Sequence, residues 1–137
     1  MEFTRLSFDQ DDVANVLAKL PPSQLDELPF GAIELDANGR ILQYNATESK
    51  LSGRAVESVI GRLFFDEVAP CTRRPEFYGR FLELVKGGPS AVFDYVFDYK
   101  MRPRQVRVHM KRALLGKTYW ILVRWNDGAG RSVAGGV

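Results

Sequence analysis

The 137-residue chain predicts a single α+β domain with a five-stranded antiparallel sheet, helices across one face of the sheet and an N-terminal helical cap across the other. Three observations support this fold class. Two strand-like runs flank an Asn-Gly pair early in the chain, three more fill its last third, and helical patterns occupy the beginning and the middle. The length suits one domain, and a hydrophobic fraction of 45% is enough for a substantial core.

The N-terminal segment has the pattern of an amphipathic helix. A first helix is predicted over residues 7–20, where Ser7 and Gln10 fit a capping box. Its apolar residues recur at helical spacing: Val13, Val16, Leu17 and Leu20. The Pro-Pro pair that follows ends this helix, and a short second helix is expected as far as Leu28. Because so short a segment buries little by itself, we expect residues 1–28 to form a cap that is stabilised by docking.

The middle of the chain predicts a hairpin and then short helices. The hairpin turns at Asp36-Ala37-Asn38-Gly39, because Asn and Gly both tolerate positive φ. Short helical pieces start at Asn45, and the clearest helix covers residues 75–86, with proline at its first position and a Gly-Gly pair as its stop. Its apolar stripe consists of Phe77, Phe81, Leu84 and Val85.

The last third of the chain predicts three strands. In VFDYVFDYKM, alternate residues share one face: Phe93, Tyr95, Phe97, Tyr99 and Met101. In VRVHMKRA, apolar Val106, Val108 and Met110 alternate with polar residues. TYWILVRW is apolar on both faces, which is typical of a central strand covered on both sides. The domain core is therefore placed at residues 29–125, and the Gly-, Ala- and Ser-rich residues 126–137 are expected to fray.

Composition and charge exclude several classes of protein. One cysteine cannot form an internal disulfide, and no cysteine or histidine cluster predicts a metal site. No run approaches the roughly 20 apolar residues of a membrane helix, and the first residues lack the layout of a secretory signal. The net charge of +2 comes from interspersed acids and bases, so a nucleic-acid partner is not expected. A cytoplasmic location and no membrane insertion follow as expectations.

Several motifs carry a resemblance to a known family. The stretch from Gly31 to Gly61, LDANGRILQYNATESKLSGR followed by VIG, resembles the core signature of PAS domains. More narrowly, ILQYNA with Glu48, VAPCT, PEFYG, FDYKM and VHMK resemble the photoactive yellow protein family of bacterial blue-light receptors. The resemblance runs in register from the first helix to about Arg124, with one gap near Gly87. It implies a PAS fold and a p-coumaric acid chromophore held as a thioester on Cys71.

The single cysteine admits three interpretations. Cys71 follows Val-Ala-Pro and precedes the predicted helix, so it could be a buried free thiol that packs as a small hydrophobe. It could be the nucleophile of a thiol hydrolase with His109 as base, but no Gly-rich nucleophile elbow surrounds it. The resemblance favours covalent attachment of the chromophore, and a thiolate can attack an activated coumaroyl ester to give a thioester.

A tyrosine and an acid near the hairpin admit two interpretations each. Glu48 follows Asn45 by three residues, as in a capping box, and Tyr44 could be an ordinary strand-end aromatic. The resemblance instead implies that both donate hydrogen bonds to the chromophore's phenolate oxygen. Glu48 must then be protonated in the dark, with its pKa raised by burial and by the adjacent negative charge.

Further residues take roles from the same resemblance. Ser52 is implied to support Tyr44, although the family more often has threonine there, and Ser49 replaces a glycine of the familiar pattern. Arg54, otherwise a solvated charge after a turn, is implied to gate the pocket from solvent. Met101 matches a family position that speeds thermal return to the dark state. The expected pocket wall consists of Ile33, Phe64, Val68, Ala69, Pro70, Thr72, Phe97, Tyr99 and Met101.

These interpretations predict a blue-light photoreceptor and not an enzyme. Light is expected to twist the chromophore's double bond from trans to cis, after which Glu48 donates its proton and becomes a buried carboxylate. A buried charge is costly, so the weakly anchored N-terminal cap is expected to be released as the signal. An unidentified downstream signalling protein is the expected partner. The alternatives are a chromophore-free PAS module that dimerises or binds another small ligand, and a thiol enzyme.

Overall fold

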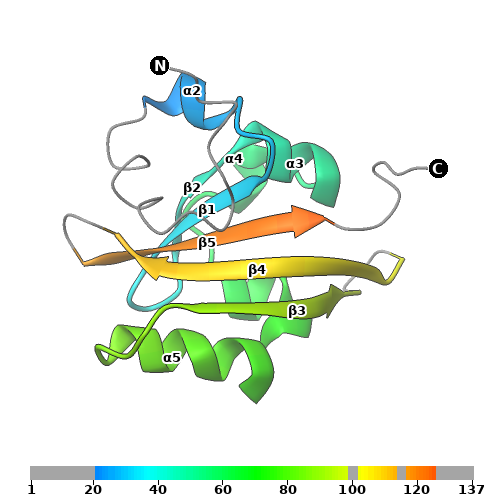
Figure 1. The fold of residues 1–137 in the computed structure, drawn as a ribbon. Helices are drawn as coiled ribbons and strands as arrows, with labels where there is room; N and C mark the ends of the chain where they lie inside the picture. Colours follow the sequence, from blue (N-terminus) through cyan, green and yellow to red (C-terminus); the bar gives the residue numbers. More distant parts are fainter. Residues whose placement is uncertain (1–20, 99–101, 114–116, 126–137) are drawn as a thin grey trace.

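The computed structural model describes residues 21–98, 102–113 and 117–125 (Figure 1). The predicted first helix, the predicted tail and two expected pocket residues, Tyr99 and Met101, lie outside these residues.

Five strands form one antiparallel sheet in the order β2-β1-β5-β4-β3 (Figure 1). Their bounds are β1 Gly31–Asp36, β2 Ile41–Tyr44, β3 Ala91–Phe97, β4 Arg104–Arg112 and β5 Thr118–Trp125. The strand that is apolar on both faces, β5, occupies the centre, as its sequence predicts. The predicted fold class is confirmed.

The β1–β2 hairpin turns at the predicted Asn-Gly pair. Gly39 has a φ of 86°, a conformation that glycine adopts without steric cost. The carboxylate of Asp36 completes the turn, because its Oδ1 accepts hydrogen bonds from the backbone N–H of Asn38 (2.9 Å) and of Arg40 (3.0 Å). An Asp side chain therefore closes the loop that the two strands alone would leave open.

Short helical segments precede β1 and connect β2 to β3. They are α2 Pro22–Leu25, α3 Ala46–Ser52, α4 Val56–Val59, η2 Phe64–Val68, η3 Pro70–Thr72, η4 Pro75–Gly79 and α5 Arg80–Val85. The helix predicted over residues 75–86 begins at Pro75 as expected, but its first five residues are wound as a π-helix. Gly87, with a φ of 100°, follows it at the predicted stop.

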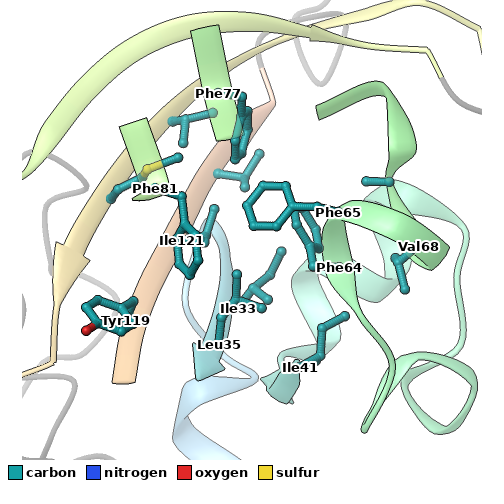
Figure 2. Close-up of a cluster of buried hydrophobic side chains, with 14 of the residues drawn as sticks. Ile33, Leu35, Ile41, Phe64, Phe65, Val68, Phe77, Phe81, Tyr119 and Ile121 are labelled. Carbon is teal, nitrogen blue, oxygen red and sulfur yellow. The ribbon is translucent and has the colours of Figure 1, made fainter. Parts of the chain in front are cut away.

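Two hydrophobic clusters lie on opposite faces of the sheet. The main cluster joins the helical segments that follow β2 to one face and contains the rings of Phe64, Phe65, Phe77 and Phe81 (Figure 2). The second cluster joins the N-terminal segment to the other face. Its members are Leu25, Leu28, Phe30, Ala32, Ala113, Trp120 and Leu122. Alternate residues of β5 serve the two clusters, so the described part of the expected cap packs on the predicted face.

The two remaining strands follow the predicted alternation. On β3, Phe93 and Phe97 are buried in the main cluster, whereas Val92 and Val96 on the opposite face are exposed. On β4, Val106, Val108 and Met110 are fully buried on the inner side. This arrangement concentrates aromatic side chains on the face that carries the candidate site.

Candidate functional site

The Glu48 carboxyl is buried because the start of α3 directs it under β1. Asn45 caps α3, and its Oδ1 accepts a hydrogen bond of 3.0 Å from the Glu48 backbone N–H. The side chain of Glu48 is 2% exposed and lies against Gly31. A Cβ atom at Gly31 would lie 2.0 Å from Glu48 Oε1, so the glycine leaves the space that the carboxyl occupies.

Burial makes this carboxyl a much weaker acid than an exposed glutamate. It raises the pKa of Glu48 to about 8, although the Trp125 hydrogen bond and the charges of Arg54 and Arg104 oppose the shift. Trp125 Nε1 donates to Glu48 Oε1 over 2.8 Å. Glu48 therefore holds its proton at neutral pH.

Only one of the two hydrogen bonds of the predicted capping box forms. Asn45 caps the helix as that pattern predicts. The carboxyl of Glu48, however, accepts from Trp125 on β5, and the backbone N–H of Asn45 donates to Ala32 O over 3.0 Å. Because β1 already satisfies that backbone donor, the acid is left to enter the core.

Tyr44 ends β2 beside this acid. Its side chain is 5% exposed, and its hydroxyl lies 2.8 Å from Ser52 Oγ on α3. Burial holds the pKa of Tyr44 well above its usual value, with a further contribution from the charge of Glu48 and opposition from Ser52 and Arg54. Tyr44 is therefore a neutral hydroxyl that shares a hydrogen bond with Ser52.

Arg54 is one of the residues that line a surface pocket of about 400 Å³. Its guanidinium donates to Ser52 O over 3.3 Å, and Ser49 Oγ donates to Arg54 O over 2.7 Å. The hydroxyl at position 49 thus fastens the turn that carries Arg54. The pocket is lined by Ser52, Gly53, Arg54, Ser58, Val59, Arg62, Glu67 and Val68.

Cys71 lies in the short 3-10 turn η3. Its side chain is half-buried and packs against the main cluster. Tyr95 on β3 donates its hydroxyl to Cys71 O over 2.6 Å, and the neighbouring Thr72 is fully buried with its Oγ1 donating to Ala69 O over 2.6 Å. The turn that presents the thiol is thereby fixed from both sides.

The structure gathers most of the predicted site residues in one place. The main cluster contains Ile33, Tyr44, Phe64, Val68, Ala69 and Phe97, with Cys71 packed against it. Pro70 and Thr72 flank the thiol in η3. Tyr44 belongs to this cluster, Cys71 packs against it, and Glu48 is joined to it through the hydrogen bond from Trp125. His109 pairs with Leu122 of the second cluster and so lies on the opposite face from Cys71, which argues against a Cys-His catalytic pair.

Sequence reasoning missed three contacts of this site. Trp125 binds Glu48, Tyr95 binds the Cys71 carbonyl, and the Arg104 guanidinium lies 4.7 Å from the Trp125 ring centroid. A buried tryptophan usually finds a partner for its N–H, so the final residue of the TYWILVRW run could have prompted a search for an acceptor. Among the described residues, no group of three or more His, Cys, Asp and Glu side chains could hold a metal ion.

Comparison with known proteins identifies the family of the chain. The chain matches the PAS fold family over residues 19–127 and so belongs to it. It is 52% identical over 120 residues to photoactive yellow protein of Rhodothalassium salexigens, covering 87% of this chain and 96% of the relative. It is 53% identical over 118 residues to that of Halochromatium salexigens, covering 85% and 94%. The chain therefore belongs to the photoactive yellow protein family, as its motifs predict.

Solved structures support the same assignment. The photoactive yellow protein domain from the sensor histidine kinase Ppr of Rhodospirillum centenum is 47% identical with a TM-score of 0.77, covering 81% of this chain and 98% of that domain. The PAS domain of an HTR-like protein from Haloarcula marismortui, 18% identical with a TM-score of 0.60, shares the fold and covers 82% and 93%. The family is one of PAS photoreceptors, which are sensory and not enzymatic, and its name implies a chromophore.

Proposed function

We propose that this chain is a blue-light photoreceptor whose chromophore is p-coumaric acid, attached as a thioester to Cys71. The observation that carries the proposal is Glu48, a fully buried acid that keeps its proton at neutral pH in the same region as the only cysteine. When bound, the chromophore supplies absorption of blue light, a trans-to-cis isomerisation and a phenolate that needs hydrogen-bond donors.

The residues present suit such a group. The half-buried thiol lies at the edge of the main cluster, where an acyl donor can reach it. Tyr44 and Glu48 are neutral groups with O–H donors, and a buried oxyanion requires such donors. Ile33, Phe64 and Phe97 supply apolar walls. Arg54, which lines the adjacent surface pocket, is suited to control access of water.

Glu48 is the group that moves a proton. In the dark it holds the proton because ionisation would place a charge in the core. After illumination it releases the proton, and its carboxylate remains buried with the Trp125 N–H as a donor. A charge so enclosed is costly unless it is well compensated, so the surrounding structure is destabilised.

The contacts of α3 suggest where that destabilisation is felt. Asn45, which caps the helix carrying Glu48, donates from Nδ2 to Leu25 O (2.9 Å) and Phe30 O (3.1 Å). Thr47 Oγ1 donates to Leu28 O over 2.7 Å. Because α3 holds the N-terminal segment through these bonds, its displacement would loosen that segment. Release of the cap, residues 1–28, from the core of residues 29–125 is the proposed output.

A downstream signalling protein would read this output. The similar domain of known structure comes from a sensor histidine kinase, which fits a role in signal transduction. In the described part of the chain, no helix has both the length and the apolar character needed to cross a membrane. We place the protein's action in the cytoplasm, with neither nucleic acid nor membrane insertion as part of it.

Mass spectrometry and absorption spectroscopy of reconstituted protein test the proposal. Wild-type protein supplied with a coumaroyl precursor is expected to carry a covalent adduct, to be yellow, to bleach in blue light and to recover in the dark. Cys71→Ala is expected to fold, as circular dichroism will show, and to lack the adduct. An adduct retained in Cys71→Ala would overturn the attachment site.

Two other outcomes would favour the alternatives. A folded wild-type protein that takes up no pigment would favour a chromophore-free PAS module. Turnover of an ester or thioester that disappears in Cys71→Ala would favour a thiol enzyme.

A further inference from the structure

The indole of Trp125 is fixed against the buried acid. It stands at the end of β5, is 6% exposed, and its Nε1 lies 2.8 Å from Glu48 Oε1. The Phe97 ring meets it edge-on with centroids 5.3 Å apart, and the Arg104 guanidinium lies 4.7 Å from its centroid. Arg104 is itself tied to the end of α3 through a 3.1 Å hydrogen bond to Leu51 O. The direction of the indole N–H is therefore determined by packing.

The chemistry of an indole restricts the state of the acid that it touches. An indole N–H is a donor and has no acceptor, so Glu48 Oε1 must accept. In a neutral carboxyl group the carbonyl oxygen is the better acceptor. Oε1 is then the carbonyl oxygen, and the proton resides on Oε2. Once the proton leaves, the same N–H donates to a carboxylate, and hydrogen bonds to charged groups are the stronger ones.

We propose that Trp125 is a positioning residue for Glu48: it assigns the transferable proton to Oε2 and stabilises the carboxylate that remains after proton release. The consequence for light sensing rests on the proposed function. The effect on Glu48 itself does not, because it depends only on the hydrogen bond between these two residues of the chain.

The charged and titratable groups that act on Glu48 do not themselves titrate near its pKa. Tyr44 from β2, Arg54 beyond α3 and Arg104 from β4 act on it, and Gly31 of β1 adds only backbone. Arginine stays protonated throughout the accessible range. Burial keeps the pKa of Tyr44 well above that of Glu48. His109 lies on the other face of the sheet. Because the titration follows the carboxyl carbon of Glu48 itself, a change in that signal near neutral pH reports this group.

The test is a carbon-13 NMR titration of the side-chain carboxyl of Glu48 in the full chain without pigment. Trp125→Phe keeps a ring but removes the N–H, and it is expected to raise the pKa of Glu48 by about one unit or more. Trp120→Phe, a change at the other tryptophan on the opposite face, is the matched control and should leave that pKa in place. An unchanged or lowered pKa in Trp125→Phe would overturn the proposal.

A second variant protects the test against misfolding. Benzothienylalanine at position 125 keeps the bicyclic shape and replaces the N–H by sulfur, so it should raise the pKa of Glu48 as Trp125→Phe does. If the isostere leaves the pKa at its wild-type value, packing alone explains the contact and the proposal fails.

The pigmented protein supplies a separate reading. The infrared C=O band of Glu48 should move to higher frequency in Trp125→Phe, because the carbonyl oxygen loses a donor, and the light-induced carboxylate should be shorter-lived. If wild-type protein binds no pigment, the proposed function fails, while the titration without pigment still decides the role of Trp125. A C=O band at its wild-type position in Trp125→Phe would contradict the proton assignment.

Discussion

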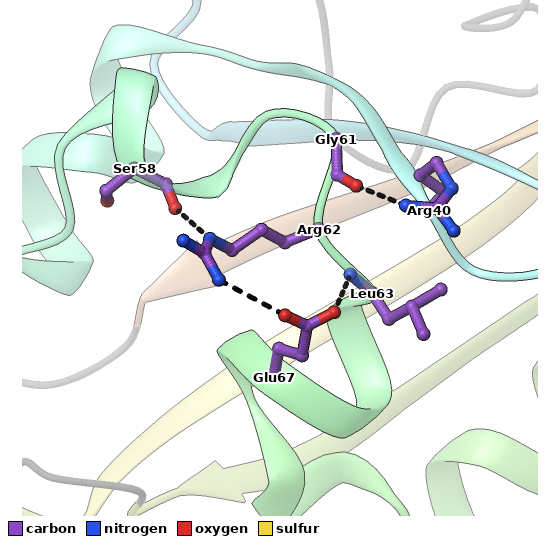
Figure 3. Close-up of polar contacts among 6 residues, drawn as sticks. All are labelled: Arg40, Ser58, Gly61, Arg62, Leu63 and Glu67. Carbon is purple, nitrogen blue, oxygen red and sulfur yellow. Dashed lines mark hydrogen bonds and ion pairs between the residues drawn. The ribbon is translucent and has the colours of Figure 1, made fainter.

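Two glutamates in the first turns of helical segments show how far the environment of a carboxyl can change its chemistry. Glu48 in α3 is 2% exposed, and burial raises its pKa to about 8. Glu67 in η2 is exposed and accepts from the Leu63 backbone N–H over 3.1 Å (Figure 3). That hydrogen bond, together with Arg62 at 3.2 Å, lowers the pKa of Glu67. The same side chain at a similar place in a helix thus has opposite shifts.

The difference between the two glutamates shows what a carboxyl needs in order to remain protonated at neutral pH. Around Glu67, donors from the backbone and from Arg62 favour the charged form, and water screens it. Around Glu48, the loss of water outweighs one indole donor and the charges of two arginines. Placement near a helix start does not decide the protonation state. The extent to which the carboxyl is buried decides it.

The sharpest way to break this comparison is to measure stability against pH in the chain without pigment. The pKa of Glu48 rises from an ordinary 4.5 to about 8 on folding, so the folded state binds the proton more tightly. The associated stability is complete below pH 4.5 and is lost as pH rises to 8. The loss could reach ~5 kcal/mol at most, by 1.36 kcal/mol for each unit of pKa.

The matched variant is Glu48→Gln, measured by urea unfolding at several pH values. It removes the titrating group and keeps the shape, so the decline of stability between pH 5 and 8 should flatten. The same decline in wild type and Glu48→Gln would show that other groups cause it.

Asn45→Ala should have the next largest effect, because it removes the side chain that caps α3. The η2 segment has no such side-chain cap. Asn45 is 1% exposed, and its side chain binds the N–H groups of Ala32 and Glu48 and the carbonyls of Leu25 and Phe30. Four lost hydrogen bonds suggest about 4 kcal/mol of stability. Urea unfolding measures the loss. Ser58→Ala, which removes one exposed hydroxyl bond to Ala55 O, is the control and should cost less than ~1 kcal/mol.

Gly31→Ala tests the space on which the buried acid depends. The added Cβ would lie 2.0 Å from Glu48 Oε1, so the carboxyl must move or the strand must shift, at a cost of about 2–3 kcal/mol. Gly79→Ala is the control, because its φ is −61° and its Cβ would meet Pro75 Cβ at an ordinary 3.9 Å. That control should be neutral or slightly stabilising. Thermal unfolding that fails to separate the two variants would refute the steric argument.

The smallest expected effect, and the one opposite in sign, comes from Glu67→Gln. The pKa of Glu67 is lowered on folding, so its stabilising contribution is present above the ordinary pKa and is lost as pH falls through the folded value. Because the group is exposed, the variant should be nearly as stable as wild type at pH 7 and should lose slightly less stability on acidification. If stability declined with rising pH in wild type and Glu67→Gln abolished that decline, the contrast with Glu48 would be overturned.

The sequence predicted the sheet better than it predicted the site. Alternation fixed the inner faces of β3 and β4, and the doubly apolar run identified β5 as central. The site residues came from resemblance to a family, since the residues alone left capping and packing interpretations open. The Trp125–Glu48 bond spans 77 residues and depends on the register that pairs Gly31 with Val123, which no local pattern specifies. The π-helical start at Pro75 likewise was absent from the predicted pattern.

The position of β5 also governs the order in which the molecule can be assembled. It is central in space, yet it is the last of the five strands to be synthesised. The bond from Thr118 Oγ1 to Glu34 Oε2, 2.7 Å long, joins residues 84 apart. A growing chain can form the β1–β2 hairpin early. The other edge of β1 stays unpaired until β5 has been synthesised. We therefore expect slow folding with an exposed strand edge during synthesis, and the apolar β5 is the segment that ends this vulnerable interval.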